Sequence, residues 1–188
     1  MIVYLHGFNS SPRSHKAQVL GRYLAQRGLA SHYACPALSV LASEALQEIE
    51  RHVSGPQVCF VGSSLGGFYA TYLAEKHGAK AVLINPAIEP HVGLRAYLGP
   101  QKNLHTGEPY ELTEAHLRAW QTLAGQRITP QRYLLLVETG DEVLDYREAV
   151  RRYAGCEQVV VPGGDHSLQS FPQHLPRIVE FAGHAALV

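Results

Sequence analysis

The sequence predicts a protein of the α/β class, with a parallel β-sheet covered by helices on both faces. Short apolar runs alternate along the chain with segments whose apolar residues recur at helical spacing. The short runs are mostly apolar throughout, which is typical of strands buried on both faces of a parallel sheet. Right-handed crossovers would then place helices on both sides of it. With 188 residues, 46% of them hydrophobic, we expect one domain spanning residues 1–188 with a sizeable core.

Six apolar runs are candidate strands, and helical patterns lie between most of them. The strands are expected at residues 2–5, 30–34, 58–61, 81–84, 133–137 and 158–161. Helical spacing marks segments 17–24, 41–49, 68–73 and 149–153.

Residues 86–130 break this alternation. This segment contains no predicted strand and carries Pro, Gly and amphipathic pieces such as ELTEAHLRAWQTL. A connection of this length after a strand is more often functional than an idle linker. We therefore expect a helical lid or cap, inserted within the single domain at 86–130.

The charge pattern argues against nucleic acid or a membrane surface as a partner. Sixteen basic and sixteen acidic side chains cancel, and no run of Lys or Arg forms a patch. Cys35, Cys59 and Cys156 are odd in number and far apart, so we expect buried free thiols, with neither a disulfide framework nor a zinc site. The chain begins MIVYLHG, without a signal-like segment. These features favour a cytoplasmic protein, and nothing in them calls for a metal or a cofactor.

A glycine-rich turn lies between the third strand and the next helix. In GSSLGG the pattern Gly-x-Ser-x-Gly falls on Gly62, Ser64 and Gly66. This is the pattern of a nucleophile elbow, in which the central serine has a strained backbone and the flanking positions lack Cβ atoms because strand and helix approach closely. Ser64, and not Ser63, fills the strained position. Its hydroxyl would lie at the carboxyl edge of the sheet, where open α/β sheets bind ligands.

Other glycine-rich loops fit this stretch less well. A phosphate-binding P-loop would end in Gly-Lys-Ser/Thr, and the stretch contains no lysine. A dinucleotide fingerprint needs Gly-x-Gly, which is also missing. A plain turn remains possible from this motif alone.

The partners of a catalytic serine would be an acid and a histidine, in that order along the chain. The sequence holds three aspartates, and all follow Ser64. Asp141 comes just after the strand at 133–137, and His166 follows the last strand in GGDHS. Each of the three residues would thus follow the end of a different strand, which predicts a Ser64, Asp141, His166 triad.

Other polar residues near these positions have alternative roles. Asp145 is a candidate N-cap of the following helix, and Asp165 is expected to hold the loop of His166. Glu138 and Glu142 are possible acids, although Glu138 belongs to the strand end and Glu142 is expected to be solvated. His6 precedes the acid in chain order, so we expect it to order its own loop and not to act in catalysis.

The loop after the first strand, HGFNSS, would complete the site. In folds that contain a nucleophile elbow, two backbone N–H groups bind the oxyanion. One belongs to the residue after the nucleophile, and the other belongs to a loop beside the elbow. Those residues are Leu65 and Phe8, and Ser14 is the expected N-cap of the helix that follows.

Several separated motifs resemble one family. YLHGFNSSPRS, VGSSLGGFYAT, NPA followed by YLG and TGEPY, TGDEVLDYREAV and GGDHS are together similar to the YqiA/YcfP-like esterase family of small α/β-hydrolases, from Met1 almost to the C-terminus. The resemblance implies hydrolysis of acyl esters or thioesters by Ser64, Asp141 and His166. It also implies a minimal three-layer α/β-hydrolase fold without the first strands of larger relatives, leaving six parallel strands in the order 2-1-3-4-5-6.

The expected function is therefore that of a serine esterase acting on a small-molecule acyl ester. A thioesterase or acyltransferase would use the same residues, and a non-catalytic ligand-binding protein with this fold is an alternative of a different class. Five residues of the insertion could present an apolar underside to an acyl chain, or could only pack the cap on the body: Leu94, Tyr97, Leu98, Leu117 and Trp120.

Overall fold

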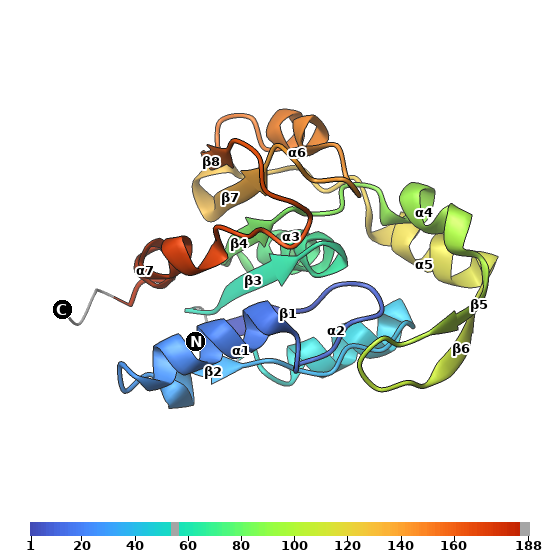
Figure 1. Cartoon of the computed structure of the whole chain (residues 1–188), viewed down its shortest axis with the longest axis horizontal. Coiled ribbons are helices and arrows are strands. Elements are labelled where there is room, and N and C mark those ends of the chain that lie inside the picture. The colour runs from blue at the N-terminus through green and yellow to red at the C-terminus, as the bar shows by residue number, and fades with distance from the viewer. Residues whose placement is uncertain (54–56, 185–188) are drawn as a thin grey trace.

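The centre of the computed structural model, which describes residues 1–53 and 57–184, is a parallel sheet of six strands (Figure 1). The strands lie in the order β2-β1-β3-β4-β7-β8, and every neighbouring pair is parallel. The predicted order 2-1-3-4-5-6 is therefore confirmed. The strand bounds are β1 (Ile2–Leu5), β2 (Tyr33–Ala34), β3 (Cys59–Ser63), β4 (Lys80–Ile84), β7 (Tyr133–Glu138) and β8 (Glu157–Val161).

Helices cover both faces of this sheet and make three layers. On one face, α1 (His15–Ala25) and α7 (Phe171–Phe181) pack on Ile2, Tyr4 and the strand residues in line with them. The other face packs against a second set of helices: α2 (Ala42–Glu50), α3 (Leu65–His77), α5 (Glu114–Leu123) and α6 (Tyr146–Arg152). Successive residues of a strand point to opposite faces, so both faces of the central strands must be apolar. The continuous apolar runs of the sequence have this origin.

The second strand is shorter than predicted. Within the run 30–34, Ala30–His32 form a 3-10 turn, η1, and only Tyr33–Ala34 pair with β1. This strand lies at the edge of the sheet with one neighbour, and its first residues, Ala-Ser-His, have little preference for a strand.

The insertion at 86–130 contains strands, so the prediction of a purely helical lid was wrong. After α4 (Pro90–Gly93) and the 3-10 turn η2 (Leu94–Tyr97), the chain forms an antiparallel hairpin of β5 (Gly99–Lys102) and β6 (Pro109–Leu112). The hairpin lies at the right edge of Figure 1, away from the central sheet. Its strands, GPQK and PYEL, are mostly outside the core and therefore need no apolar run. Apolar runs were the basis for predicting strands, so these two were not predicted. Helix α5 and the 3-10 turn η3 (Pro130–Arg132) lead back to β7.

None of the helices in the described ranges combines the length and the apolarity that crossing a bilayer requires.

Candidate active site

The turn between β3 and α3 has the geometry of a nucleophile elbow. Ser64 has φ 55° and ψ −120°, a conformation that non-glycine residues rarely adopt. A Cβ at Gly62 would collide with the backbone of Gly66, and one at Gly66 would collide with the carbonyl of Leu5. The expected strain at the serine and the need for glycine on both sides of it are thus confirmed.

The hydroxyl of Ser64 opens into a cavity of about 600 Å³ at the carboxyl edge of the sheet. His166 lines the same cavity, together with Lys16, His15 and Glu142. Within the part of the chain that the structure describes, Ser64 Oγ has no hydrogen-bond partner. The serine and the histidine therefore line one cavity, and no direct hydrogen bond joins their side chains within the described residues.

His166 is bound to Asp141. The imidazole Nδ1 lies 2.8 Å from Oδ2 and 3.0 Å from Oδ1 of Asp141, whose side chain is 1% exposed. A carboxylate only accepts hydrogen bonds, so Nδ1 carries the proton and Nε2 keeps a free lone pair. The backbone N–H groups of Val143 and Leu144 also donate to Oδ1, at 2.9 Å each.

These contacts keep Asp141 ionised. Burial by itself would raise the pKa of its carboxyl, but the hydrogen bonds from His166, Leu144 and Val143 outweigh burial and hold the pKa below the usual value. A carboxylate held beside Nδ1 fixes the tautomer in which Nδ1 carries the proton and the Nε2 lone pair is free to accept one.

The other aspartates lie elsewhere. Asp145 caps α6, accepting from the N–H of Arg147 at 3.0 Å, as expected from the sequence. Asp165 is half-buried and accepts from the N–H of Ser167 at 2.8 Å and from Nε2 of Gln169 at 2.8 Å, which orders its own loop. Neither side chain is bonded to the imidazole in the described hydrogen-bond network.

Two glutamates support the loop of His166. Glu142 is exposed, as expected, and its carboxylate also accepts from the backbone N–H of His166 at 3.0 Å. Glu138 ends β7, is 1% exposed, and also binds this loop through its carboxylate. Asn85, just after β4, is a third support that the sequence search missed. The available signal was its position, directly after a strand of the sheet, like Ser64, Asp141 and His166.

The first loop lies against the serine. A Cβ on Gly7 would be 3.3 Å from Ser64 Cβ, so glycine allows the closest approach here. The backbone N–H groups of Phe8 and Leu65 have no acceptor within the described residues. Both groups flank Ser64 in the chain or in space and are free to bind an oxygen atom of a ligand.

His6 orders this loop, as its position in the chain predicts. Its Nε2 accepts from the N–H of Leu38 at 3.0 Å, which leaves Nδ1 protonated and donating to the carbonyl of Gly7 at 3.0 Å. The side chain is 4% exposed, and burial, the largest effect, lowers the pKa of the imidazole. Both nitrogens are occupied, so His6 has no free atom for proton transfer.

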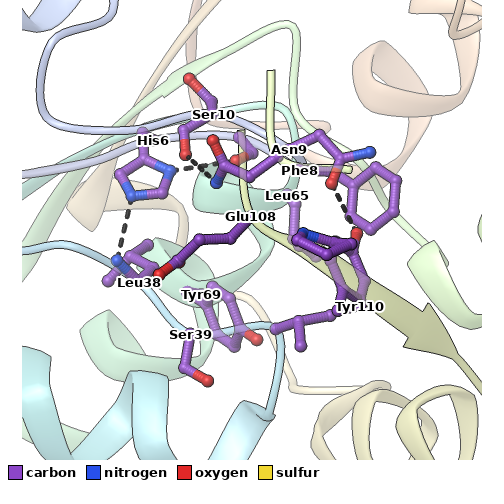
Figure 2. Close-up of a pocket in the computed structure, with 14 residues that line it drawn as sticks. His6, Phe8, Asn9, Ser10, Leu38, Ser39, Leu65, Tyr69, Glu108 and Tyr110 are labelled. Atoms are coloured by element: carbon purple, nitrogen blue, oxygen red, sulfur yellow. Dashed lines mark hydrogen bonds between the residues drawn. The ribbon is translucent and has the colours of Figure 1, made fainter. Parts of the chain in front are cut away.

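Figure 2 shows the residues that line a second cavity, of about 470 Å³, Phe8 among them. Leu65 and Tyr69 of α3 line it, together with residues 38–40 and the hairpin residues Glu108 and Tyr110. The two cavities share Gly7, Phe8 and Ser10. The loop after β1 therefore borders both cavities.

The hairpin is fastened to that loop. Tyr110 donates its hydroxyl proton to Asn9 Oδ1 at 2.5 Å, Asn103 donates to the carbonyl of Ser10 at 3.0 Å, and the N–H of Leu104 donates to the carbonyl of Asn9 at 3.1 Å. The insertion thus braces residues next to Phe8.

The five apolar residues predicted for the underside of the insertion line neither cavity. Trp120 and Leu117 are 0% and 1% exposed, and Trp120 donates its indole N–H to the hydroxyl of Tyr69 at 2.7 Å. Leu94 is partly buried against the same core, whereas Tyr97 and Leu98 are 49% and 37% exposed. Of the two roles expected for these residues, Leu117 and Trp120 have the packing role, because they are buried in the core that α5 shares with α2 and α3.

The cysteines do not supply a nucleophile. Burial raises the pKa of Cys59 and of Cys35 to about 12 and that of Cys156 to about 11, so all three are protonated thiols at neutral pH. Only Cys59 is fully buried, and the other two are partly exposed, contrary to the expectation for them. Among the described residues, no group of three or more His, Cys, Asp or Glu side chains is placed to hold a metal ion.

Comparison with known proteins identifies the family. A family model described as "Uncharacterised protein family (UPF0227)" matches residues 1–183. This is the YqiA/YcfP family that the motifs resemble, so that prediction is confirmed.

Solved structures show the same fold at low sequence identity. A presumed hydrolase from Agrobacterium vitis S4 superimposes with a TM-score of 0.77 and 19% identity, covering 96% of this chain and 87% of that chain. Alpha/beta hydrolase domain-containing protein 10 from mouse gives 0.71 and 15%, covering 95% and 87%. A monoacylglycerol lipase from Paleococcus ferrophilus gives 0.65 and 17%, covering 98% and 94%. The predicted α/β-hydrolase fold is confirmed.

Proposed function

We propose that this chain, which belongs to the family UPF0227, is a serine hydrolase that cleaves carboxylic esters through an acyl-enzyme. The observation that carries the proposal is the pairing of the buried Asp141 with Nδ1 of His166, which lines the same cavity as Ser64. The occurrence of a monoacylglycerol lipase among proteins of the same fold is consistent with ester chemistry.

In the acylation step, Ser64 Oγ attacks the carbonyl carbon of the ester while His166 Nε2 takes the hydroxyl proton. The carbonyl oxygen becomes an oxyanion, which the N–H groups of Phe8 and Leu65 bind; each such donor contributes on the order of 3 kcal/mol in the transition state. His166 then gives its proton to the departing alkoxide, which leaves as the alcohol. Asp141 holds the imidazole in the required tautomer throughout.

Deacylation repeats these steps with water. His166 Nε2 takes a proton from a water molecule, whose oxygen attacks the acyl-enzyme carbonyl. The same two N–H groups bind the second oxyanion. Ser64 Oγ then leaves with the proton from His166, which releases the carboxylic acid and restores the free enzyme.

The two cavities suggest where the parts of the ester lie. The leaving oxygen must be near His166, which protonates it, so we place the alcohol in the cavity lined by Lys16 and His15. The acyl group then extends past the Phe8 loop into the cavity lined by Leu65 and Tyr69. Thioesters would fit the same arrangement, because only the leaving atom differs.

A fluorophosphonate probe tests the proposal directly. We expect covalent labelling and ester hydrolysis by the unaltered protein, and loss of both in Ser64→Ala. The matched control is Ser63→Ala, the neighbouring serine that ends β3, which should keep most of its activity. Absence of labelling in the unaltered protein would favour a ligand-binding protein, and loss of activity in the control alone would assign the nucleophile to Ser63.

A graded panel of acyl esters and acyl-CoA thioesters would then define the leaving group. Higher kcat/KM for the esters supports an esterase, whereas preference for the thioesters would assign the thioesterase alternative.

A further inference from the structure

The loop that carries His166, residues 162–170, is held by side chains from outside it. It connects β8 to α7 and contains turns but no helix or strand. Its supports include the side chains of Lys16, Asn85, Glu138 and Glu142, and Thr139 Oγ1 accepts from the N–H of Gly163.

Glu138 binds three backbone N–H groups of this loop. Its Oε2 accepts from Asp165 at 2.9 Å and from Gln169 at 3.0 Å, and its Oε1 accepts from Ser170 at 2.8 Å. An ionised carboxylate that is 1% exposed is costly unless donors compensate it, and charge-assisted hydrogen bonds of this kind are the strong ones. Burial by itself would raise the pKa of Glu138, but the hydrogen bonds outweigh burial and lower it.

Asn85 binds the carbonyl groups of the same loop. Its Nδ2 donates to the carbonyls of Asp165 and His166 at 3.1 Å each, and its Oδ1 accepts from the backbone N–H of Glu138 at 3.1 Å. The residue is 2% exposed and has φ 38°, a conformation that asparagine tolerates better than most residues. Asn85 therefore ties the two peptide groups around His166 to the end of β7.

The glycines before His166 fit this arrangement. A Cβ on Gly164 would collide with the carboxylate of Glu138, and Gly163 and Gly164 have φ values of 76° and 70°. The Gly-Gly of GGDHS thus lets the loop pass directly over the buried carboxylate.

The remaining supports act nearer to solvent. Lys16 Nζ donates to the carbonyl of Ser167 at 2.7 Å, and Glu142 accepts from the N–H of His166 at 3.0 Å. Both side chains line the cavity of Ser64 and can also meet substrate, so they are less suitable for testing the loop alone.

We propose that Glu138 and Asn85 are positioning residues that fix the loop of His166, so that Nδ1 meets Asp141 and Nε2 faces Ser64. The inference rests on the proposed function. Neither residue lines the cavity of Ser64, so both act through the histidine and not on the substrate. Without these two side chains, the peptide groups of the loop would bind water instead. The imidazole of His166 would then lose its fixed position relative to Ser64.

Steady-state kinetics of Glu138→Gln on an activated acetyl ester is the first test. Glutamine keeps the size of the side chain, but an NH₂ group replaces one of the two carboxylate oxygens. This NH₂ group would face backbone N–H donors of the loop, from which it cannot accept a hydrogen bond. We expect kcat to fall about ten- to a hundred-fold, because small displacements of a reacting group are costly, while KM changes less than about two-fold.

Glu75 offers a matched control at the opposite end of β7. Its carboxylate binds a loop in the same manner, accepting from the N–H of Thr129 at 2.7 Å, from Arg132 at 2.7 Å and from the hydroxyl of Tyr133 at 2.8 Å. Glu75→Gln should lower the melting temperature in the same direction as Glu138→Gln but leave kcat unchanged. Equal loss of kcat in both variants would reduce the role of Glu138 to general stability.

A double-mutant cycle separates positioning from stability. Residues that act through one imidazole have non-additive effects, so Glu138→Gln should cost little further kcat in the background of Asp141→Asn. Glu75→Gln should have the same small effect in both backgrounds. Fully multiplicative losses for Glu138→Gln and Asp141→Asn would overturn the inference.

Asn85→Gly carries the same test if Glu138→Gln does not fold. Glycine accepts the positive φ of this position and removes only the amide. We expect the same fall in kcat with KM preserved, and unchanged kcat would overturn the role of Asn85. Fluorophosphonate labelling of the unaltered protein, scored first, keeps a failure of this inference distinct from a failure of the proposed function.

Discussion

His166 Nδ1 lies 2.8 Å from the buried Oδ2 of Asp141, although 24 residues separate the two in the chain. The pairing arises because β7 and β8 are parallel neighbours, so the loops after them leave the same edge of the sheet. Of the three aspartates, Asp141 is the one that meets the imidazole, and it is therefore the acid of the proposed mechanism.

Replacing this acid by its amide should abolish most turnover. Asp141→Asn keeps the shape of the side chain but holds the imidazole in the wrong tautomer, which we expect to reduce kcat on the order of 10⁴-fold. Asp145→Asn is the control, because it removes only the cap of α6 and should cost roughly 1 kcal/mol of stability. Steady-state rates on an activated short-chain ester, with folding checked by circular dichroism, compare the two. If Asp145→Asn were the inactive variant, the acid would come from the helix start.

Trp120 should matter for stability and not for chain-length preference. The side chain is 0% exposed and donates to Tyr69, so Trp120→Ala should lower the free energy of unfolding by about 3–5 kcal/mol. Below its melting temperature, the variant should keep the unaltered ratio of kcat/KM for hexanoyl and acetyl esters. Urea unfolding and an ester series measure these quantities. A selective loss of kcat/KM for the longer ester would mean that Trp120 contributes to the acyl-binding site.

The assignment of the two cavities predicts separate control of the two halves of the ester. Val40→Phe narrows the cavity beyond the Phe8 loop and should lower kcat/KM for longer acyl groups of one alcohol. His15→Phe changes the cavity beside His166 and should alter preference among alcohols of one acyl group. Two ester series, one varied in each half, measure both effects. If Val40→Phe instead altered the preference among alcohols and His15→Phe the preference among acyl groups, the two cavities would be assigned the other way round.

Acid should destabilise the protein partly through Glu138. Its pKa is lower in the folded protein than the ordinary 4.5, so the unfolded chain binds this proton first as the pH falls. The stabilisation is present above that ordinary value and is lost as the pH falls toward the folded pKa. We therefore expect the melting temperature of the unaltered protein to fall more steeply between about pH 5 and pH 3.5 than that of Glu138→Gln. Parallel curves would mean that Glu138 carries no such stabilisation.

Much of this architecture was readable from the sequence because it depends on local patterns. Strands buried on both faces must be apolar throughout, and the turn at Ser64 excludes Cβ atoms at Gly62 and Gly66, so both leave a signature in the residues themselves. The order of serine, acid and histidine, each after a strand, follows from the same reading. The hairpin at β5 and β6 was missed because strands outside the core need no apolar run.

The tertiary structure alone decided which residues meet. Glu138 lies outside the motifs, and Asn85 belongs to the NPA motif, which does not indicate what its side chain binds. The role of both residues depends on β4, β7 and the loop after β8 ending side by side at one edge of the sheet. Trp120 was equally compatible from its sequence with a lid surface or with the core, since helical periodicity gives an apolar face but not its partner. Contacts between residues distant in the chain are set by how whole elements pack, and no local pattern records them.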